Sequence, residues 1–270
     1  MNFSVLMSIY HKEKSDNLDQ CIKSIWIDQI SKPNEIILVE DGPLTKSLYE
    51  CINKWKKDIG LPFRIIRLNE NIGLGAALNE GIKKCTHNVI ARMDTDDIAF
   101  SNRFSKQLEF LNSNNDIDVV GTHIEEFGDG INYSKVVKYP LEHKNMLNLF
   151  KKRVPIAHVT AMFRKSFFEK AGFYPTENHI SNEDTLLWMH GFDKGCKFSN
   201  IDIIGVKVRV STDFFGRRSS FKKVFSDYKN RIEVVEKLNF GIDAYIYAIL
   251  VLLVNILPPQ LKKIAYKTLR

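Results

Sequence analysis

Three carboxylates stand within four residues, at Asp94, Asp96 and Asp97, directly after the apolar run Val89–Met93. Carboxylates this close repel one another unless a cation or strong hydrogen-bond donors lie among them. Their oxygens suit Mg²⁺ and Mn²⁺, which bind through one or two carboxylates together with substrate phosphates. The spacing lacks the distal glutamate of a calcium-binding EF-hand loop. Segment 92–97 therefore predicts a metal-assisted phosphate site, with a solvated acidic turn as the alternative.

Other polar residues follow three earlier segments whose composition is typical of strands. They are Tyr10 and Glu13 after Phe3–Ile9, Asp41 after Glu35–Val39, and Asn71 and Gly73 after Phe63–Leu68. In parallel α/β sheets the ligand lies beyond the carboxyl ends of the strands. We therefore expect these residues to share a crevice with the carboxylates of segment 92–97.

The run from Asn71 to Asn79 contains two glycines and opens a predicted helix. Glycines permit close backbone approach, and a helix N-terminus attracts phosphate. The alternative is that these small residues only pack the helix on the sheet. The run is neither GxGxxG nor a Walker motif, which argues against a Rossmann cofactor and a P-loop.

The elements that must position these residues alternate between strand and helix over the first 120 residues. Amphipathic helices are predicted at Leu18–Ile30 and Ser101–Asn112, and a further strand at Asp118–Gly121. This order predicts an α/β fold with a Rossmann-like, mostly parallel central sheet that has helices on both faces. Beyond residue 140 we predict short helices at His143–Lys151 and Lys165–Lys170, a β-like segment at Val159–Phe163, a helix at Glu183–Gly195 and a strand at Ile201–Val210.

The tail differs in composition from the rest of the chain. Residues 201–270 hold 13 Lys and Arg against 6 Asp and Glu, an excess equal to the whole net charge of +7. The run Ala244–Leu257 is almost wholly apolar but shorter than the roughly 20 residues that a spanning helix needs. It predicts either a helix in the membrane interface, favoured by the flanking Lys262, Lys263, Lys267 and Arg270, or a buried helix. We therefore divide the chain into a domain of residues 1–210 and a basic, amphipathic helical extension of residues 211–270.

Composition excludes several classes of protein. The four cysteines are scattered without a CxxC pair, which favours a reducing cytosol and argues against a zinc site. The first apolar run spans about eight residues without a basic leader, so we interpret it as a buried strand rather than a signal peptide. The sequence has no evident aromatic-basic recognition motif, so we expect no nucleic-acid partner.

Five motifs, in this order along about 210 residues, carry a family resemblance. They are Ser4–Tyr10, Val39–Gly42, Asn71-x-Gly73, Arg92-x-Asp94-x-Asp96-Asp97, and Glu183-Asp184 followed by Leu187-Trp188. Together they resemble the family 2 glycosyltransferases, which have the GT-A fold. Segments 155–160, 163–165, 216–218 and 266–270 are similar to the amylovoran-biosynthesis-like branch of bacterial O-antigen and exopolysaccharide enzymes. His11-Lys12 and Ser219 depart from that pattern. These departures put the local shape of the loops in doubt, but they remove no charged group that is expected to act.

The resemblance implies a role for each matching residue. It implies donor binding by Ser8, Tyr10, Glu13, Asp41, Asn71, Gly73, Arg92 and Asp94, with Asp41 on the uracil ring. Asp96 would ligate Mn²⁺ or Mg²⁺ with the donor diphosphate, and Asp184 would be the catalytic base. His158, Glu183, Arg217 and Arg218 would serve the acceptor or a diphosphate. The alternatives are a plain N-terminal helix acid for Asp184, a structural histidine for His158 and an exposed basic pair for Arg217 and Arg218.

The family resemblance implies an inverting transferase, and the branch favours transfer of a hexose, glucose or galactose, from a UDP-sugar. Together with the basic tail it implies a sugar-diphosphate-polyprenyl acceptor. The branch favours a β1,3 linkage in O-antigen or exopolysaccharide repeat units, made at the cytoplasmic face of the inner membrane by a peripherally bound enzyme. One alternative is transfer of an N-acetylhexosamine. Another is a related hydrolase or nucleotidyltransferase, which could also use an Asp-rich metal site. A third is a non-enzymatic membrane-surface binding module, which would leave Asp94, Asp96 and Asp184 without a purpose. The sequence leaves the oligomeric state open.

Overall fold

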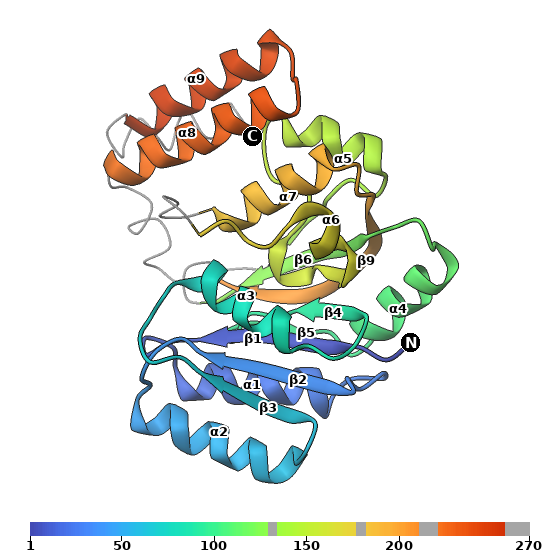
Figure 1. Cartoon of the computed structure of the whole chain (residues 1–270), viewed down its shortest axis with the longest axis vertical. Helices are drawn as coiled ribbons and strands as arrows, with labels where there is room; N and C mark the ends of the chain where they lie inside the picture. Colours follow the sequence, from blue (N-terminus) through green and yellow to red (C-terminus); the bar gives the residue numbers. More distant parts are fainter. Residues whose placement is uncertain (129–133, 177–181, 211–220, 257–270) are drawn as a thin grey trace.

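A mixed β-sheet forms the centre of the computed structural model, which describes residues 1–128, 134–176, 182–210 and 221–256 (Figure 1). Within these described residues, nine strands follow the order β3-β2-β1-β4-β8-β6-β9-β5, with β7 paired to β6. Their bounds are β1 Ser4–Ile9, β2 Glu35–Glu40, β3 Phe63–Arg67, β4 Val89–Arg92, β5 Ile98–Ala99, β6 Val119–Phe127, β7 Lys135–Val137, β8 Met162–Arg164 and β9 Phe198–Arg209.

The α/β prediction is confirmed, and the sheet is parallel only in part. Strands β1 to β4 pair in parallel, as predicted, and β6 pairs in parallel with β9. The pairings of β8 with β4 and β6, of β5 with β9 and of β7 with β6 are antiparallel. The parallel strands β1, β2 and β4 are almost continuously buried, as expected for strands covered on both faces.

Helices cover both faces of the sheet and bury two apolar cores. One core lies under α1 (Ser15–Trp26), α2 (Lys46–Ile59) and α4 (Arg103–Ser113). The other lies under α3 (Leu74–Lys84), α5 (His143–Phe150), α6 (Ser166–Ala171) and α7 (Glu183–Asp193). In the second core Trp188 stacks on Phe163 with ring centroids 5.6 Å apart, so the helix that begins at Glu183 is fixed on the sheet by aromatic packing.

The β-like segment predicted at Val159–Phe163 is interrupted by a turn. Residues His158–Thr160 form a 3-10 turn, and only Met162–Arg164 pair as β8. Both the backbone N–H and the hydroxyl of Thr160 donate to the carbonyl of Ala157, at 2.9 and 2.8 Å. These two hydrogen bonds close the turn and compete locally with strand pairing. The β-branched residues Val159 and Thr160 favour a strand, so the composition of the segment does not reveal the turn.

The predicted helical tail is observed as two helices, α8 (Phe221–Lys237) and α9 (Ile242–Ile256), which lie side by side beyond α7 (Figure 1). The proposed boundary between residues 210 and 211 borders a segment outside the described residues. Arg217, Arg218 and the cations after residue 257 also lie outside them.

Candidate active site

The ends of the first four strands open into one cleft of about 760 Å³. Its lining includes the predicted residues Ser8, Tyr10, Glu13, Asp41, Asn71, Gly73, Asp94 and Asp96. These residues are up to 88 positions apart in the sequence and meet because parallel strands end at the same edge of the sheet. The predicted shared crevice is therefore confirmed as a place, while the roles of its residues stay predictions.

Asp41 orders the loop that carries Asn71 and Gly73. One carboxylate oxygen accepts the N–H of Ile72 at 2.8 Å, and the other accepts the N–H of Gly73 at 3.2 Å. Each oxygen keeps a further lone pair, so the carboxylate can still accept a ligand N–H from the cleft. The contact with uracil that the resemblance implies is thus compatible with this structural role.

Gly42 lets the Asp41 loop and the Asn71 loop approach each other. Its φ of +83° lies in the region that favours glycine, and a Cβ there would stand 2.8 Å from the backbone nitrogen of Asn71. The glycine in Val39–Gly42 is therefore required by this close backbone approach.

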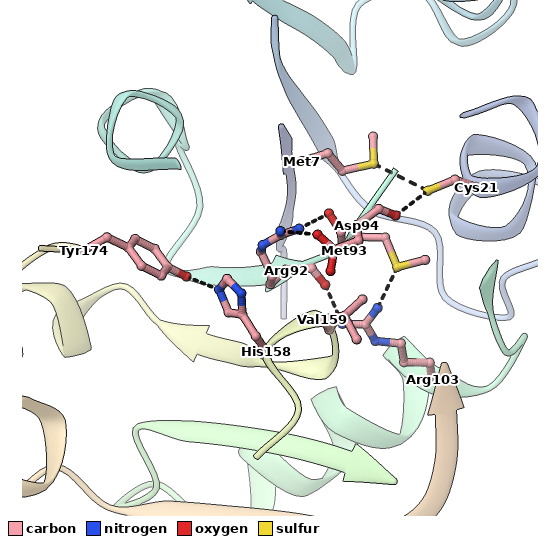
Figure 2. Close-up of polar contacts among 9 residues, drawn as sticks. All are labelled: Met7, Cys21, Arg92, Met93, Asp94, Arg103, His158, Val159 and Tyr174. Carbon is pink, nitrogen blue, oxygen red and sulfur yellow. Dashed lines mark hydrogen bonds and ion pairs between the residues drawn. The ribbon is translucent and has the colours of Figure 1, made fainter. Parts of the chain in front are cut away.

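Arg92 lies beneath the cleft rather than in its lining, with 1% of its surface exposed. Its guanidinium donates to the Asp94 carboxylate and to the Met93 carbonyl (Figure 2). Arg92 therefore supports the cleft through Asp94, and the direct donor contact predicted for it stays untested.

The acidic loop is also held by Arg209, at the end of β9. The backbone N–H of Arg209 donates to the Asp97 carboxylate at 2.7 Å, and its side-chain Nε donates to the Asp96 backbone carbonyl at 3.0 Å. Arg209 also lines the cleft. We did not identify this residue from the sequence, because its place depends on the distant pairing of β9 with β5, which no local motif signals.

The carboxylates of the cleft fit a divalent cation. Burial, and then the nearby carboxylates of Asp94 and Glu13, raise the pKa of Asp96 to about 7. Such a concentration of negative charge is what a divalent ion neutralises. Among the described residues no three His, Cys, Asp or Glu side chains converge in a geometry that could hold a metal. The coordination shell of the cation would therefore have to be completed by oxygens of the bound donor. This agrees with the prediction that Asp96 is the one protein residue that coordinates the metal.

Asp184 lies in the first turn of α7, outside the lining of the cleft. Its carboxylate accepts the N–H of Thr185 at 2.7 Å, and burial together with the Glu183 carboxylate raises its pKa to about 6. A Cβ on Gly75, in the first turn of α3, would stand 3.2 Å from the Cβ of Glu183. The N-terminal turns of α3 and α7 are therefore in contact, which brings the acidic pair close to the Asn71–Gly73 loop.

His158 is hydrogen-bonded to Tyr174 and lies beside Arg92 (Figure 2). Its Nε2 is 2.7 Å from the Tyr174 hydroxyl. Burial, followed by the positive charge of Arg92, lowers the pKa of His158 to about 3, so the imidazole is neutral. The structure thus gives His158 a polar partner, and its acceptor role stays a prediction.

Arg103 is a further buried cation that sequence analysis missed. It is fully buried, and its Nη2 donates to the carbonyls of Arg92 at 2.6 Å and Val159 at 2.9 Å (Figure 2). Burial lowers its pKa to about 9. Arg103 therefore ties the end of β4, two residues before Asp94, to the turn that carries His158.

Comparison with known proteins agrees with this arrangement. The sequence pattern of Glycosyl transferase family 2 matches residues 4–172, more than half of the chain. The chain belongs to glycosyltransferase family 2. It is therefore a transferase, and the resemblance seen in its motifs is confirmed.

Two relatives match this glycosyltransferase over nearly its whole length. The amylovoran biosynthesis glycosyltransferase AmsE of Erwinia amylovora is 33% identical over 98% of each chain. An Escherichia coli UDP-Gal:alpha-D-GlcNAc-diphosphoundecaprenol beta-1,3-galactosyltransferase is 30% identical over 98% of this chain and 95% of its own. The structure of S. aureus TarS in complex with UDP-GlcNAc superposes with a TM-score of 0.64 at 16% identity, covering 97% of this chain and 83% of TarS. That likeness confirms the GT-A fold.

Proposed function

We propose that this glycosyltransferase moves a hexose, galactose or glucose, from a UDP-sugar to a sugar linked through diphosphate to a polyprenyl lipid, with inversion at the anomeric carbon. The observation that carries the proposal is that one cleft collects Asp41, Glu13, Asp94 and Asp96 at the ends of parallel strands. The E. coli relative, named for a UDP-galactose donor and a GlcNAc-diphosphoundecaprenol acceptor, supports the substrate class and a β1,3 linkage. The repeat unit of an O-antigen or exopolysaccharide would be the product.

On the donor side, Asp41 and the Asn71–Gly73 loop would bind the base and ribose together with Tyr10 and Glu13. Asp96 would hold Mn²⁺ or Mg²⁺ together with diphosphate oxygens, and the ion would neutralise the charge on the departing UDP. Arg209 and Arg92 keep the backbone and the side chain of this acidic loop in place.

On the acceptor side, Asp184 would take the proton of the attacking hydroxyl as the new glycosidic bond forms. With a pKa of about 6 its carboxylate is mostly ionised at neutral pH and still basic enough to accept a proton. Its place in the first turn of α7 also favours the ionised form. Glu183 and His158 would contact the acceptor, with Arg217 and Arg218 on a diphosphate.

The acceptor lipid would bring the enzyme to the cytoplasmic face of the inner membrane as a peripheral protein. In the part of the chain that the structure describes, every helix is too short or too polar to span a bilayer. A second candidate donor is a UDP-N-acetylhexosamine, which TarS holds in its solved complex.

Product analysis tests the proposal. UDP-galactose, UDP-glucose, UDP-GlcNAc and UDP-GalNAc would each be incubated with Mn²⁺ and synthetic GlcNAc- or GalNAc-diphosphate-lipid, and the product linkage determined by NMR. We expect a β1,3-linked hexose from one UDP-hexose. An α-linked product, or transfer to neither acceptor, would overturn the proposal, and a β-linked N-acetylhexosamine would establish the second candidate.

A further inference from the structure

The outermost helix, α9, exposes a continuous apolar face. We call this face the α9 stripe. Its large side chains, each 42 to 78% exposed, are Ile242, Ile246, Ile249, Leu250, Leu253 and Ile256. With 3.6 residues per turn these positions span an arc of roughly 120° on one side of the helix. The opposite side carries Ala244 and Ala248, each 1% exposed, and packs on the protein. A stripe of six exposed aliphatic side chains indicates a surface that a partner covers.

Cations border one edge of the α9 stripe. The Lys152 ammonium and the Arg231 guanidinium lie over the Tyr247 ring, 6.0 and 5.3 Å from its centroid. The Lys151 ammonium is 3.6 Å from the Asp243 carboxylate. Helical spacing places Asp243, Tyr247 and Leu250 in one row, so these cations flank the aliphatic side chains. An apolar helix face flanked by Lys and Arg is typical of helices that lie in the interface of anionic membranes.

The dimensions and charge of the helix favour a lipid surface over the other possible occupants. The 15 residues of α9 span about 22 Å, too short for a hydrocarbon core of about 30 Å, so the helix would lie along a membrane. A second copy of the chain would bring together two molecules that each carry a net charge of +7, which repel each other. An anionic lipid surface attracts the same charge.

We propose that the α9 stripe inserts into the interface of an anionic phospholipid surface, with α9 parallel to the membrane plane. The inference rests on the proposed lipid-linked acceptor and assigns the surface that brings the enzyme to it. The helical hairpin formed by α8 and α9 is joined to the acceptor side, because the Asn182 side-chain amide donates to Asp227 of α8. Asn182 immediately precedes Glu183 and Asp184, so a docked hairpin would hold the start of α7 at a fixed height above the lipid.

Vesicle flotation of the full chain tests the proposal. We expect wild-type protein to float with phosphatidylglycerol/phosphatidylcholine vesicles and much less with phosphatidylcholine alone. The double variant Ile246→Asp/Leu253→Asp should bind the anionic vesicles at least about tenfold more weakly, because two carboxylates would enter the interface. The matched control is Ile27→Asp/Leu61→Asp, which changes two aliphatic residues that are 54% and 96% exposed and should float like wild type. They follow α1 and α2, which lie at the other end of the molecule from α9 (Figure 1).

Two further measurements make each outcome decisive. Circular dichroism melting should show that both double variants fold, and Ile246→Ser/Leu253→Ser provides a milder change with the same expected direction. If wild type does not float, or if the α9 variants float like the control, the proposal is wrong. It is also wrong if ultracentrifugation shows that the α9 variants dissociate a dimer while flotation is unchanged.

Activity separates this inference from the proposed function. Transfer to a short-chain, water-soluble acceptor should be equal in wild type and in the α9 double variant, whereas transfer to acceptor embedded in anionic vesicles should fall in the variant. Absence of transfer by wild type to any acceptor would contradict the proposed function and leave the flotation result intact.

Discussion

The donor side and the acceptor side of the candidate site are built on different kinds of support. The donor residues other than Arg92 stand at the ends of four parallel strands, all before residue 97, and line one cleft. Acceptor residues come from a 3-10 turn at His158 and from the first turn of α7, which is fixed by helix packing. Substitutions on the donor side should therefore impair donor binding, whereas substitutions on the acceptor side should impair transfer and leave donor binding intact.

The largest effect is expected on the donor side. Asp96→Ala removes the carboxylate that would hold the cation and should lower the rate of sugar transfer by roughly 10³-fold or more, because charge on the departing UDP is no longer neutralised. Initial rates with saturating acceptor measure this loss. Asp28→Ala, an exposed carboxylate outside the cleft, is the control. If Asp96→Ala kept a transfer rate within tenfold of wild type, Asp96 would not be the metal ligand.

Asp184→Asn should be nearly as severe for transfer and should spare the donor. Losing a general base costs about 10² to 10⁴-fold in rate, and the amide keeps the shape of the carboxylate. We expect kcat to fall while calorimetry shows unchanged UDP affinity. Asp193→Asn, at the other end of α7, tests whether the effect belongs to this position. A weakened UDP affinity in Asp184→Asn would break the division between the two sides.

At saturating Mn²⁺, where a bound cation would keep Asp96 ionised, the pH dependence of kcat should report Asp184. Its pKa of about 6 means that the base becomes protonated, and inactive, as the pH falls below 6. With saturating donor and acceptor we expect kcat to be level above pH 7 and to fall about tenfold per pH unit below pH 5. A profile without an acid limb between pH 5 and 7 would argue against this carboxylate as the base.

A smaller effect should follow from loosening the acidic loop without removing a carboxylate. Arg209→Gln loses the Nε contact with the Asp96 carbonyl, and we expect KM for the UDP-sugar to rise by about tenfold with a smaller change in kcat. Lys207→Gln, on the same strand, removes a cation that does not line the cleft and should leave KM unchanged. Equal effects of the two substitutions would assign the change to net charge rather than to loop position.

The same contrast explains what the sequence could predict. The donor cleft followed from local signals, because apolar strand runs with polar residues after them must converge in a parallel sheet. The turn at His158, the antiparallel β8 and the place of Arg209 depend on pairings between distant segments. Arg103 was missed for a related reason: a helical arginine is usually solvated, and only the packed structure shows this one buried against backbone carbonyls.

The most direct test of the account is the melting temperature of the protein with UDP and Mn²⁺, added singly and together. A ligand that binds only the folded state raises the melting temperature. We predict a rise that needs both ligands in wild type and in Asp184→Asn, and no such rise in Asp96→Ala. A rise with UDP that is the same without Mn²⁺, or one that Asp96→Ala retains, would contradict the metal-bridged donor site.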